Sequence, residues 1–183
     1  MPKAKRGRGS NHVLRAISLD EAVRIIEGTF AFAAKHKLRA LAAIVLDAGG
    51  RVKAFMKQDG ASLMRFEIAY GKAFAALALG RSSRLVLQKS REKPIFMANL
   101  EKLSDGPMFL EGGGQLIRDQ SGEVIGAIGV TGDVNEMDDL AAVDGIHSVG
   151  FRTDYDFKDA DDIHALNIKE DALPKAPNKA PQR

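Results

Sequence analysis

The sequence LAAIVLDAGGRVKAFMK at residues 41–57 predicts a β-hairpin. Residues 41–46 form an apolar run of strand length, and Asp47 to Gly50 follow it. The two glycines accept the positive φ angles of a tight turn. Residues 51–57 then alternate charged and apolar side chains, as a half-buried return strand does. This hairpin favours an antiparallel sheet over alternating strand–helix–strand units.

On both sides of the hairpin, the pattern predicts helices and a second hairpin. Ser18 and Glu21 have the spacing of a capping box, which begins a helix that should run to about Lys37. A second long helix should end at Gly80, a residue type favoured just after a helix. The remaining predicted elements are helices at 63–79, from Ser82 or Ser83 to before Pro94, at 95–103 and at 136–148, and strands at 115–118 and 124–130.

These elements predict an α/β protein of the α+β kind, an antiparallel sheet with helices packed on it. We expect a basic flexible arm at 1–15, one domain at 16–150, and an extended or disordered tail at 151–183, where charges and prolines replace periodicity. Phe151, Tyr155 and Phe157 are exceptions, because apolar rings in a polar tail often dock. Either a neighbouring subunit or the chain's own surface can receive them.

The charge distribution argues against nucleic acid as a partner. Lys3, Lys5, Arg6 and Arg8 carry four positive charges, and subtracting them from the net charge of +3 leaves −1 for the rest. A nucleic-acid-binding domain usually carries a basic face on its fold as well. The chain has no Cys, no secretory signal pattern and no apolar run long enough for a membrane span. We expect a cytoplasmic protein without a membrane partner.

Five fragments in order resemble the GlcG/HbpS family, which includes the C-terminal domain of PduO proteins. The resemblance covers roughly residues 16–148. The fragments are Val45–Gly50, Asp59–Ala61, Glu67–Ala73, Gly112–Gly114 and Gly126–Gly132, with Asp138 six residues after the last of them.

The resemblance implies a profilin-like fold with a five-stranded antiparallel sheet. It also implies a homo-oligomer, often of six or eight subunits, and an association with haem or other tetrapyrroles and with glycolate or propanediol use. Two features depart from the family: Gln115 stands where a Pro usually precedes the strand, and the tail beyond Gly150 is not shared.

Lys72 is the first candidate site residue, because it lies in an otherwise apolar helical run. Leaving its ammonium buried and unpaired would cost several kcal/mol. It can hold a carboxylate or haem propionate, or act as a base beside an acid. The structural alternative is a salt bridge to Asp138 or Glu67. Glu67 is five residues earlier, about 140° around the helix, which disfavours a direct pair.

Gly112, Gly113 and Gly114 can present consecutive amides to an anion, or simply allow a close approach of the backbone. We count these glycines and Thr131 with Lys72 as candidate ligand contacts. The acids Asp133, Glu136, Asp138 and Asp139 suit the start of a helix, or a cation.

Histidine offers the candidate iron ligands. His36 and His147 are the two inside the predicted domain, and each also suits a helix C-terminus, where the dipole favours a cation. No pair of histidines has the spacing of three or four that a helical metal chelate needs.

Three functional hypotheses follow. The first is an oligomer that binds haem or a related carboxylate-bearing small ligand. The alternative is an enzyme of small organic-acid catabolism that uses Lys72 with Asp138 or Glu67. The third is an assembly role in which the tail recruits another protein.

Overall fold

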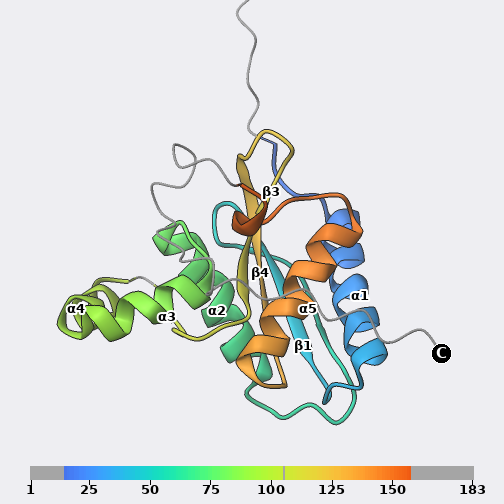
Figure 1. Cartoon of the computed structure of the whole chain (residues 1–183), viewed down its shortest axis with the longest axis horizontal. Helices are drawn as coiled ribbons and strands as arrows, with labels where there is room; N and C mark the ends of the chain where they lie inside the picture. Colours follow the sequence, from blue (N-terminus) through green and yellow to red (C-terminus); the bar gives the residue numbers. More distant parts are fainter. Residues whose placement is uncertain (1–14, 105, 158–183) are drawn as a thin grey trace, which may run out of the picture.

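The computed structural model describes residues 15–104 and 106–157, and Figure 1 shows their arrangement. Nearly all of the predicted basic arm, and the tail beyond residue 157, lie outside the described residues. The elements are α1 (Leu19–His36), β1 (Ala42–Asp47), β2 (Val52–Lys57), α2 (Arg65–Leu79), α3 (Ser83–Glu92), α4 (Pro94–Leu103), β3 (Gly114–Arg118), β4 (Val124–Thr131), α5 (Asn135–Ser148) and the 3-10 helix η1 (Asp154–Asp156).

Both hairpins are confirmed, and so is the capping box of α1. The Glu21 amide donates to Ser18 Oγ, and the Glu21 carboxylate accepts from the Ser18 amide. The sheet has the order β2-β1-β4-β3 with antiparallel neighbours throughout. None of the described helices combines the length and the apolar character that a bilayer-spanning segment needs.

The prediction of five strands is wrong for the described residues, which form a four-stranded sheet. Two segments that flank β3 show why. Before it, the chain follows α2, because the Phe109 amide donates to the Gly71 carbonyl at 3.1 Å. After α5, Arg152 pairs with Arg118 at the free edge of β3 in one isolated bridge. The turn that begins at Thr153 then ends the pairing.

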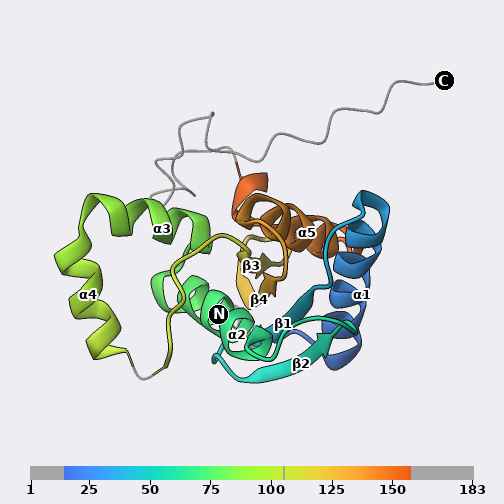
Figure 2. The ribbon, with the colours of Figure 1, turned by 90° about the horizontal axis from the view of Figure 1, so that it is seen from below.

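Helices cover both faces of the sheet (Figure 2). Alternate residues along β1 divide between the two cores: Ala43 and Val45 pack with α1 and α5, whereas Ile44 and Leu46 pack with α2. This is the period of two that a strand imposes on its side chains. The first core also takes in Phe151, from the segment after α5.

Helix α2 lies unusually close to β4. A Cβ atom on Gly129 would stand 1.9 Å from the Ala69 carbonyl oxygen and 3.0 Å from the Ala73 amide nitrogen, so only glycine fits there. Small residues on the two elements therefore bring the backbone of α2 onto the sheet. This contact holds Lys72, between Ala69 and Ala76, against the end of β4.

The domain continues through Phe157, seven residues past the predicted boundary. Phe151 and Asp154 are buried. Because the segment packs on α5 and on the edge of β3, the chain's own surface is where Phe151 and Tyr155 dock. The α3–α4 arm, by contrast, projects from the side of the molecule (Figures 1 and 2), and Met97 is the buried residue of α4.

Candidate functional site

Lys72 is buried in an ion pair. Its side chain is 2% exposed, and Nζ donates to Asp138 Oδ2 at 3.0 Å and to the Val130 carbonyl at 3.1 Å. The salt bridge to Asp138 that the sequence allowed is therefore present. A charged pair this deep is weak evidence of a stabilising role, because removing both charges from water offsets much of their attraction.

Asp138 connects this pair to the turn before α5. Its second carboxylate oxygen accepts from the Asp133 amide at 3.0 Å. Burial raises the pKa of Asp138 above its ordinary value, against the opposing effect of the Lys72 charge. Both side chains thus form their hydrogen bonds with other groups inside the fold.

The geometry gives no open acid–base centre to the enzyme alternative. Glu67 is exposed on α2, whereas Lys72 and Asp138 are at most 2% exposed, so a substrate has no direct access to the pair.

The glycine run does meet Lys72. Gly113 has a φ angle of +107°, and a Cβ atom there would lie 3.1 Å from Lys72 Nζ and 2.4 Å from the Val130 carbonyl oxygen. Its amide donates to Asp139 Oδ1 at 3.1 Å, and the Gly114 amide donates to Ser83 Oγ at 2.7 Å. These two amides are therefore engaged within the protein, and the geometry favours close backbone approach over an open anion nest.

Thr131 lies at the end of β4 and is 2% exposed. Its hydroxyl accepts from the Arg65 guanidinium at 2.9 Å. The structure thus places Thr131, Lys72 and the glycines around one buried region, but the open cavity lies beside them.

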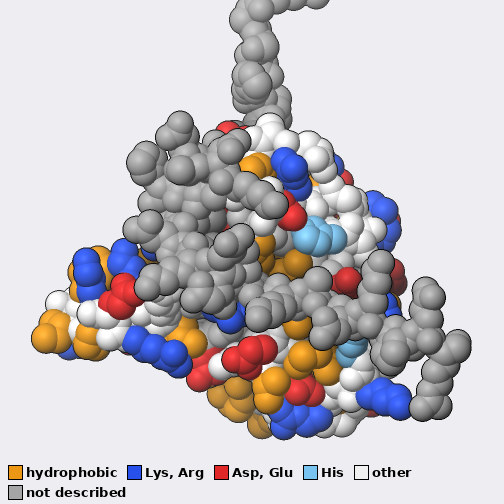
Figure 3. Space-filling view, viewed as in Figure 1, with side chains coloured by type: hydrophobic (Ala, Val, Ile, Leu, Met, Phe, Trp, Pro, Cys, Tyr) orange, Lys and Arg blue, Asp and Glu red, His pale blue; other side chains and the backbone are white. Residues whose placement is uncertain are grey.

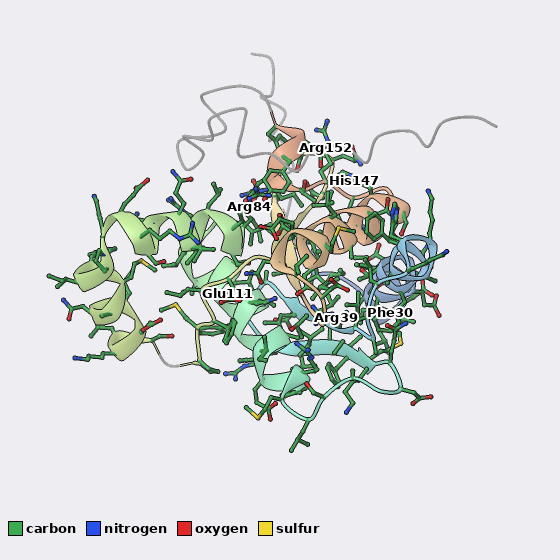
Figure 4. All side chains as sticks on the ribbon, turned by 60° about the horizontal axis from the view of Figure 1, so that its bottom comes forward. Phe30, Arg39, Arg84, Glu111, His147 and Arg152 are labelled. Carbon is green, nitrogen blue, oxygen red and sulfur yellow. The ribbon has the colours of Figure 1, made fainter. Side chains whose placement is uncertain are left out.

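That cavity, of about 360 Å³, lies between α3, the start of α5 and the C-terminal segment. The cavity walls combine two guanidinium groups, two leucines and several other polar side chains. In Figure 4, Arg84 lies on the side of α3 near the segment that bears Arg152, far from Arg39 and Phe30. The lining residues are Arg84, Leu85, Leu87, Gln88, Arg91, Glu92, Gly112, Asn135, Glu136 and Tyr155.

The charges around the cavity are mixed. Arg84 is 31% exposed and lies 4.0 Å from Asp139, whereas Arg91 is exposed. Gln88 holds the carboxylate of Glu92 at 2.9 Å. Both arginines come from one face of α3, about two turns apart, and each can bind a carboxylate bidentately. Glu92 and Glu136 line the same cavity and carry the opposite charge.

A buried polar network backs the cavity at Tyr155. Asp139 accepts from the Tyr155 hydroxyl at 3.1 Å and from Gln115 Nε2 at 2.6 Å, in addition to Gly113. Gln115 also donates to the Tyr155 oxygen at 3.2 Å. Burial raises the pKa of Asp139 despite these donors. The residue that departs from the family pattern, Gln115, therefore orients two members of this network.

Asp154 anchors the segment of η1 that carries Tyr155. This carboxylate is 2% exposed, accepts from the Ser82 amide at 3.1 Å and pairs with Arg118 at 2.6 Å. Burial raises the pKa of Asp154, partly offset by Arg118. Ser82 is the N-cap residue of α3, and Tyr155 follows Asp154 in the chain. The hydrogen bond from Ser82 to Asp154 therefore fixes Tyr155 and α3 relative to each other.

Neither candidate iron ligand lines the cavity. His147 Nε2 lies 2.7 Å from Asp156 Oδ2, on the far side of η1 from Arg84 (Figure 4). His36 stacks on Phe32 with ring centroids 4.2 Å apart. Among the described residues, no group of three or more His, Asp or Glu side chains is arranged to hold a metal ion.

A second cavity, of about 260 Å³, lies between α2 and α4. Its lining is apolar apart from Ser104 and includes Phe74, Leu100 and Met108. It offers no cation to a carboxylate, so the first cavity remains the candidate ligand site.

Sequence reasoning named Gly112 and Glu136, which line this cavity, but missed Arg84, Gln88 and Arg91 on α3. Arg84, Gln88 and Arg91 follow the i, i+4, i+7 spacing of one helix face, which is a signal that could have found them. Asp139 belongs by its position to the acids that complement the dipole of α5, yet it is buried. Its partners come from β3 and η1, and no local pattern brings those segments together.

A comparison with protein families shows which family this chain belongs to. The family model described as haem degrading protein HbpS-like matches residues 17–147, which is well over half of the chain. No curated protein matches this chain.

Solved structures share the fold at 22% identity. The crystal structure of a PduOC:heme complex has a TM-score of 0.67, covering 75% of this chain and 98% of that one. A double mutant of HbpS from Streptomyces reticuli has a TM-score of 0.66, with coverage of 82% and 97%. The protein ORFY from Klebsiella pneumoniae has a TM-score of 0.64, with coverage of 81% and 96%. At this level of identity the likeness establishes the fold alone.

Proposed function

This chain belongs to the HbpS-like family, and we propose on that basis that it binds haem or a related carboxylate-bearing small ligand in the cavity between α3 and α5. The family model supports a haem-related ligand. One structural relative, PduOC, is a complex with heme, which is consistent with the same ligand class.

The pairing of Arg84 and Arg91 on one wall of the cavity carries this proposal. Guanidinium groups match carboxylates in geometry and charge, and Leu85 and Leu87 offer apolar contact to the body of the ligand. The cavity volume lies within the ~300–1,000 Å³ of typical ligand pockets. Gly112 lines the cavity, whereas Lys72 and Asp138 lie behind the glycine run. We therefore propose that Gly112 contacts the ligand and that Lys72, Asp138, Gly113 and Gly114 shape the site.

Haem fits this site in part. The arginines would hold its propionates and the leucines would contact one face of the ring. Bound haem would supply its iron chemistry, and the contribution of this chain is to bind and orient the periphery of the ring.

We also propose a cytoplasmic homo-oligomer, of six or eight subunits as the family resemblance implied. Exposed apolar side chains at the two ends of α4 support an assembly: Ile95 is 79% exposed and Leu103 is 82% exposed. Hydrophobic groups gather there beside lysines and arginines (Figure 3). Light scattering on the purified protein measures the subunit number directly.

Titration with hemin tests the binding proposal. The full chain should give a saturable change in the Soret band. The double substitution Arg84→Ala/Arg91→Ala should weaken binding at least tenfold, because each guanidinium lost removes a charge-assisted contact. Arg51→Ala is the matched control, since this exposed arginine lies in the β1–β2 turn. Equal affinity of the double variant and the control would refute this site.

A further inference from the structure

We infer that the α3–α5 cavity recognises the carboxylates and apolar body of its ligand and supplies no side-chain ligand to a bound iron. The ligand class is then tetrapyrroles, or similar planar acids, with or without a metal. This inference deepens the proposed function and rests on it.

The cavity lining is the first observation. Haem iron in proteins is held by His, Cys, Met or Tyr. Of the described residues that line the cavity, Tyr155 alone is of these types. The other polar groups on the wall are guanidinium, amide and glutamate side chains. The Tyr155 hydroxyl is therefore the one group on the described lining that could bind an iron ion.

The Tyr155 hydroxyl already forms hydrogen bonds within the protein. Its hydroxyl donates to Asp139 Oδ2 at 3.1 Å, accepts from Gln115 at 3.2 Å and lies 3.3 Å from Ser82 Oγ. Iron would need the phenolate. Burial, together with the nearby Asp139 charge, raises the pKa of Tyr155 well above its ordinary value. Turning this oxygen towards a ligand would also leave Asp139 buried with one donor fewer, which is unfavourable.

The histidines of the described residues cannot replace it. Asp156 engages the His147 ring at 2.7 Å, outside the cavity lining. His36 ends α1, and its Nε2 atom is buried within the fold. Arg39, three residues later, lies at the end of the molecule away from Arg84 (Figure 4). Neither histidine is among the described residues that line the cavity.

The consequence is a small difference between ligands with and without iron. A bond from a protein side chain to iron would favour hemin strongly over the metal-free ring. Recognition through the carboxylates treats the two alike, because both carry the same two propionates. We expect the dissociation constants of hemin and metal-free protoporphyrin to agree within about threefold, since a tenfold ratio already needs 1.4 kcal/mol of added interaction.

The test compares these two ligands on the full chain, with absorbance for hemin, fluorescence for protoporphyrin, and competition between them. Both should bind one common site, and Arg84→Ala/Arg91→Ala should weaken both by a similar factor while Arg51→Ala leaves both unchanged. The Soret position of the hemin complex should be the same in Tyr155→Phe, His36→Ala and His147→Ala as in the parent.

The outcomes separate the two proposals. Hemin binding more than thirtyfold tighter than protoporphyrin, or a Soret shift in any of the three ligand-position variants, overturns the inference and leaves the proposed function intact. If neither ligand binds saturably, the proposed function fails as well. Thermal melting of each variant verifies that the fold is retained.

Discussion

At the scale of single residues, the buried Lys72–Asp138 pair links the elements that lie behind the site. Its three polar contacts, from Nζ to Val130 and Asp138 and from Asp138 to the Asp133 amide, join α2, β4 and α5. Each charge is tolerated because the other is present. Removing one partner leaves a buried charge uncompensated, whereas neutralising both does not.

Lys72→Met should lower the free energy of unfolding by about 3–5 kcal/mol, in the range measured when one partner of a buried pair is lost. The double variant Lys72→Met/Asp138→Asn should lose less than the sum of the single variants, because no buried charge is left uncompensated in it. Urea denaturation of the four proteins gives the coupling energy. Additive losses would show that the ion pair does not couple the two residues.

At the scale of elements, α1 and α5 approach each other at two glycines, Gly28 and Gly145. A Cβ atom on Gly145 would stand 2.6 Å from the Ile25 carbonyl oxygen and 2.2 Å from Thr29 Oγ1. On Gly28 it would stand 2.3 Å from Ser148 Oγ, the end of a side chain that can rotate. The two positions look alike in the sequence, but the backbone lies nearer to Gly145, with the Ile25 oxygen at 2.6 Å, than to Gly28, with the Gly145 Cα at 3.2 Å.

Gly145→Ala should therefore lower the free energy of unfolding by about 1–3 kcal/mol, the usual cost of overpacking. Gly28→Ala should be nearly neutral, because the gain in helix propensity of up to ~1 kcal/mol offsets the displaced Ser148 hydrogen bond to the Gly145 carbonyl. Chemical denaturation of both variants measures the contrast. Similar losses in the two would contradict the assigned packing.

At the scale of the whole molecule, the segment after α5 closes the fold and carries one wall of the cavity. Besides Phe151 and Tyr155, three polar contacts hold it: the Arg152 bridge to Arg118, the Asp154 anchor, and the pair of His147 with Asp156. Only the last involves a group that titrates near neutrality. Its hydrogen bond to Asp156 raises the pKa of His147, although burial opposes this.

The sign of the pH effect follows from the two directions. A raised pKa means that the His147 contribution is complete below its unfolded value of ~6.5 and is lost as pH rises through the folded pKa. Burial alone would raise the pKa of Asp156, but hydrogen bonds from His147 and Thr153 lower it. Its contribution is therefore present above ~4 and lost on further acidification.

His147→Ala should thus be less stable than the parent at pH 5.5 and should approach it at pH 9. The gap should stay below ~1 kcal/mol, because the side chain is 42% exposed and the pair is screened by solvent. Denaturant midpoints at several pH values measure it, and Asp156→Asn should narrow the gap. A gap that does not change with pH would show that protonation of His147 has no part in holding this segment.

Local pattern was sufficient for most of the fold. Ser18 and Glu21 marked the start of α1, Gly80 the end of α2, and the alternation at residues 51–57 marked β2, because each depends on contacts within one turn or one strand. The five fragments also identified the family, which the match over residues 17–147 confirms. The number of strands could not be predicted in this way. Whether the segments beside β3 form a further strand depends on the Phe109 hydrogen bond to α2 and on the single bridge of Arg152, which are both contacts between distant parts of the chain.

The sequence by itself determined the elements, the family and the choice of Lys72 as a residue that needs a partner, because apolar periodicity and a lone charge are local properties. Tertiary structure settled the choice between the two predicted partners in favour of Asp138, and it alone decided that the amides of Gly113 and Gly114 turn inward and that the open cavity lies at Arg84 and Arg91. Those outcomes depend on which segments from α3, β3, α5 and η1 meet. Residues 66 positions apart in the chain, as Lys72 and Asp138 are, share no local signal.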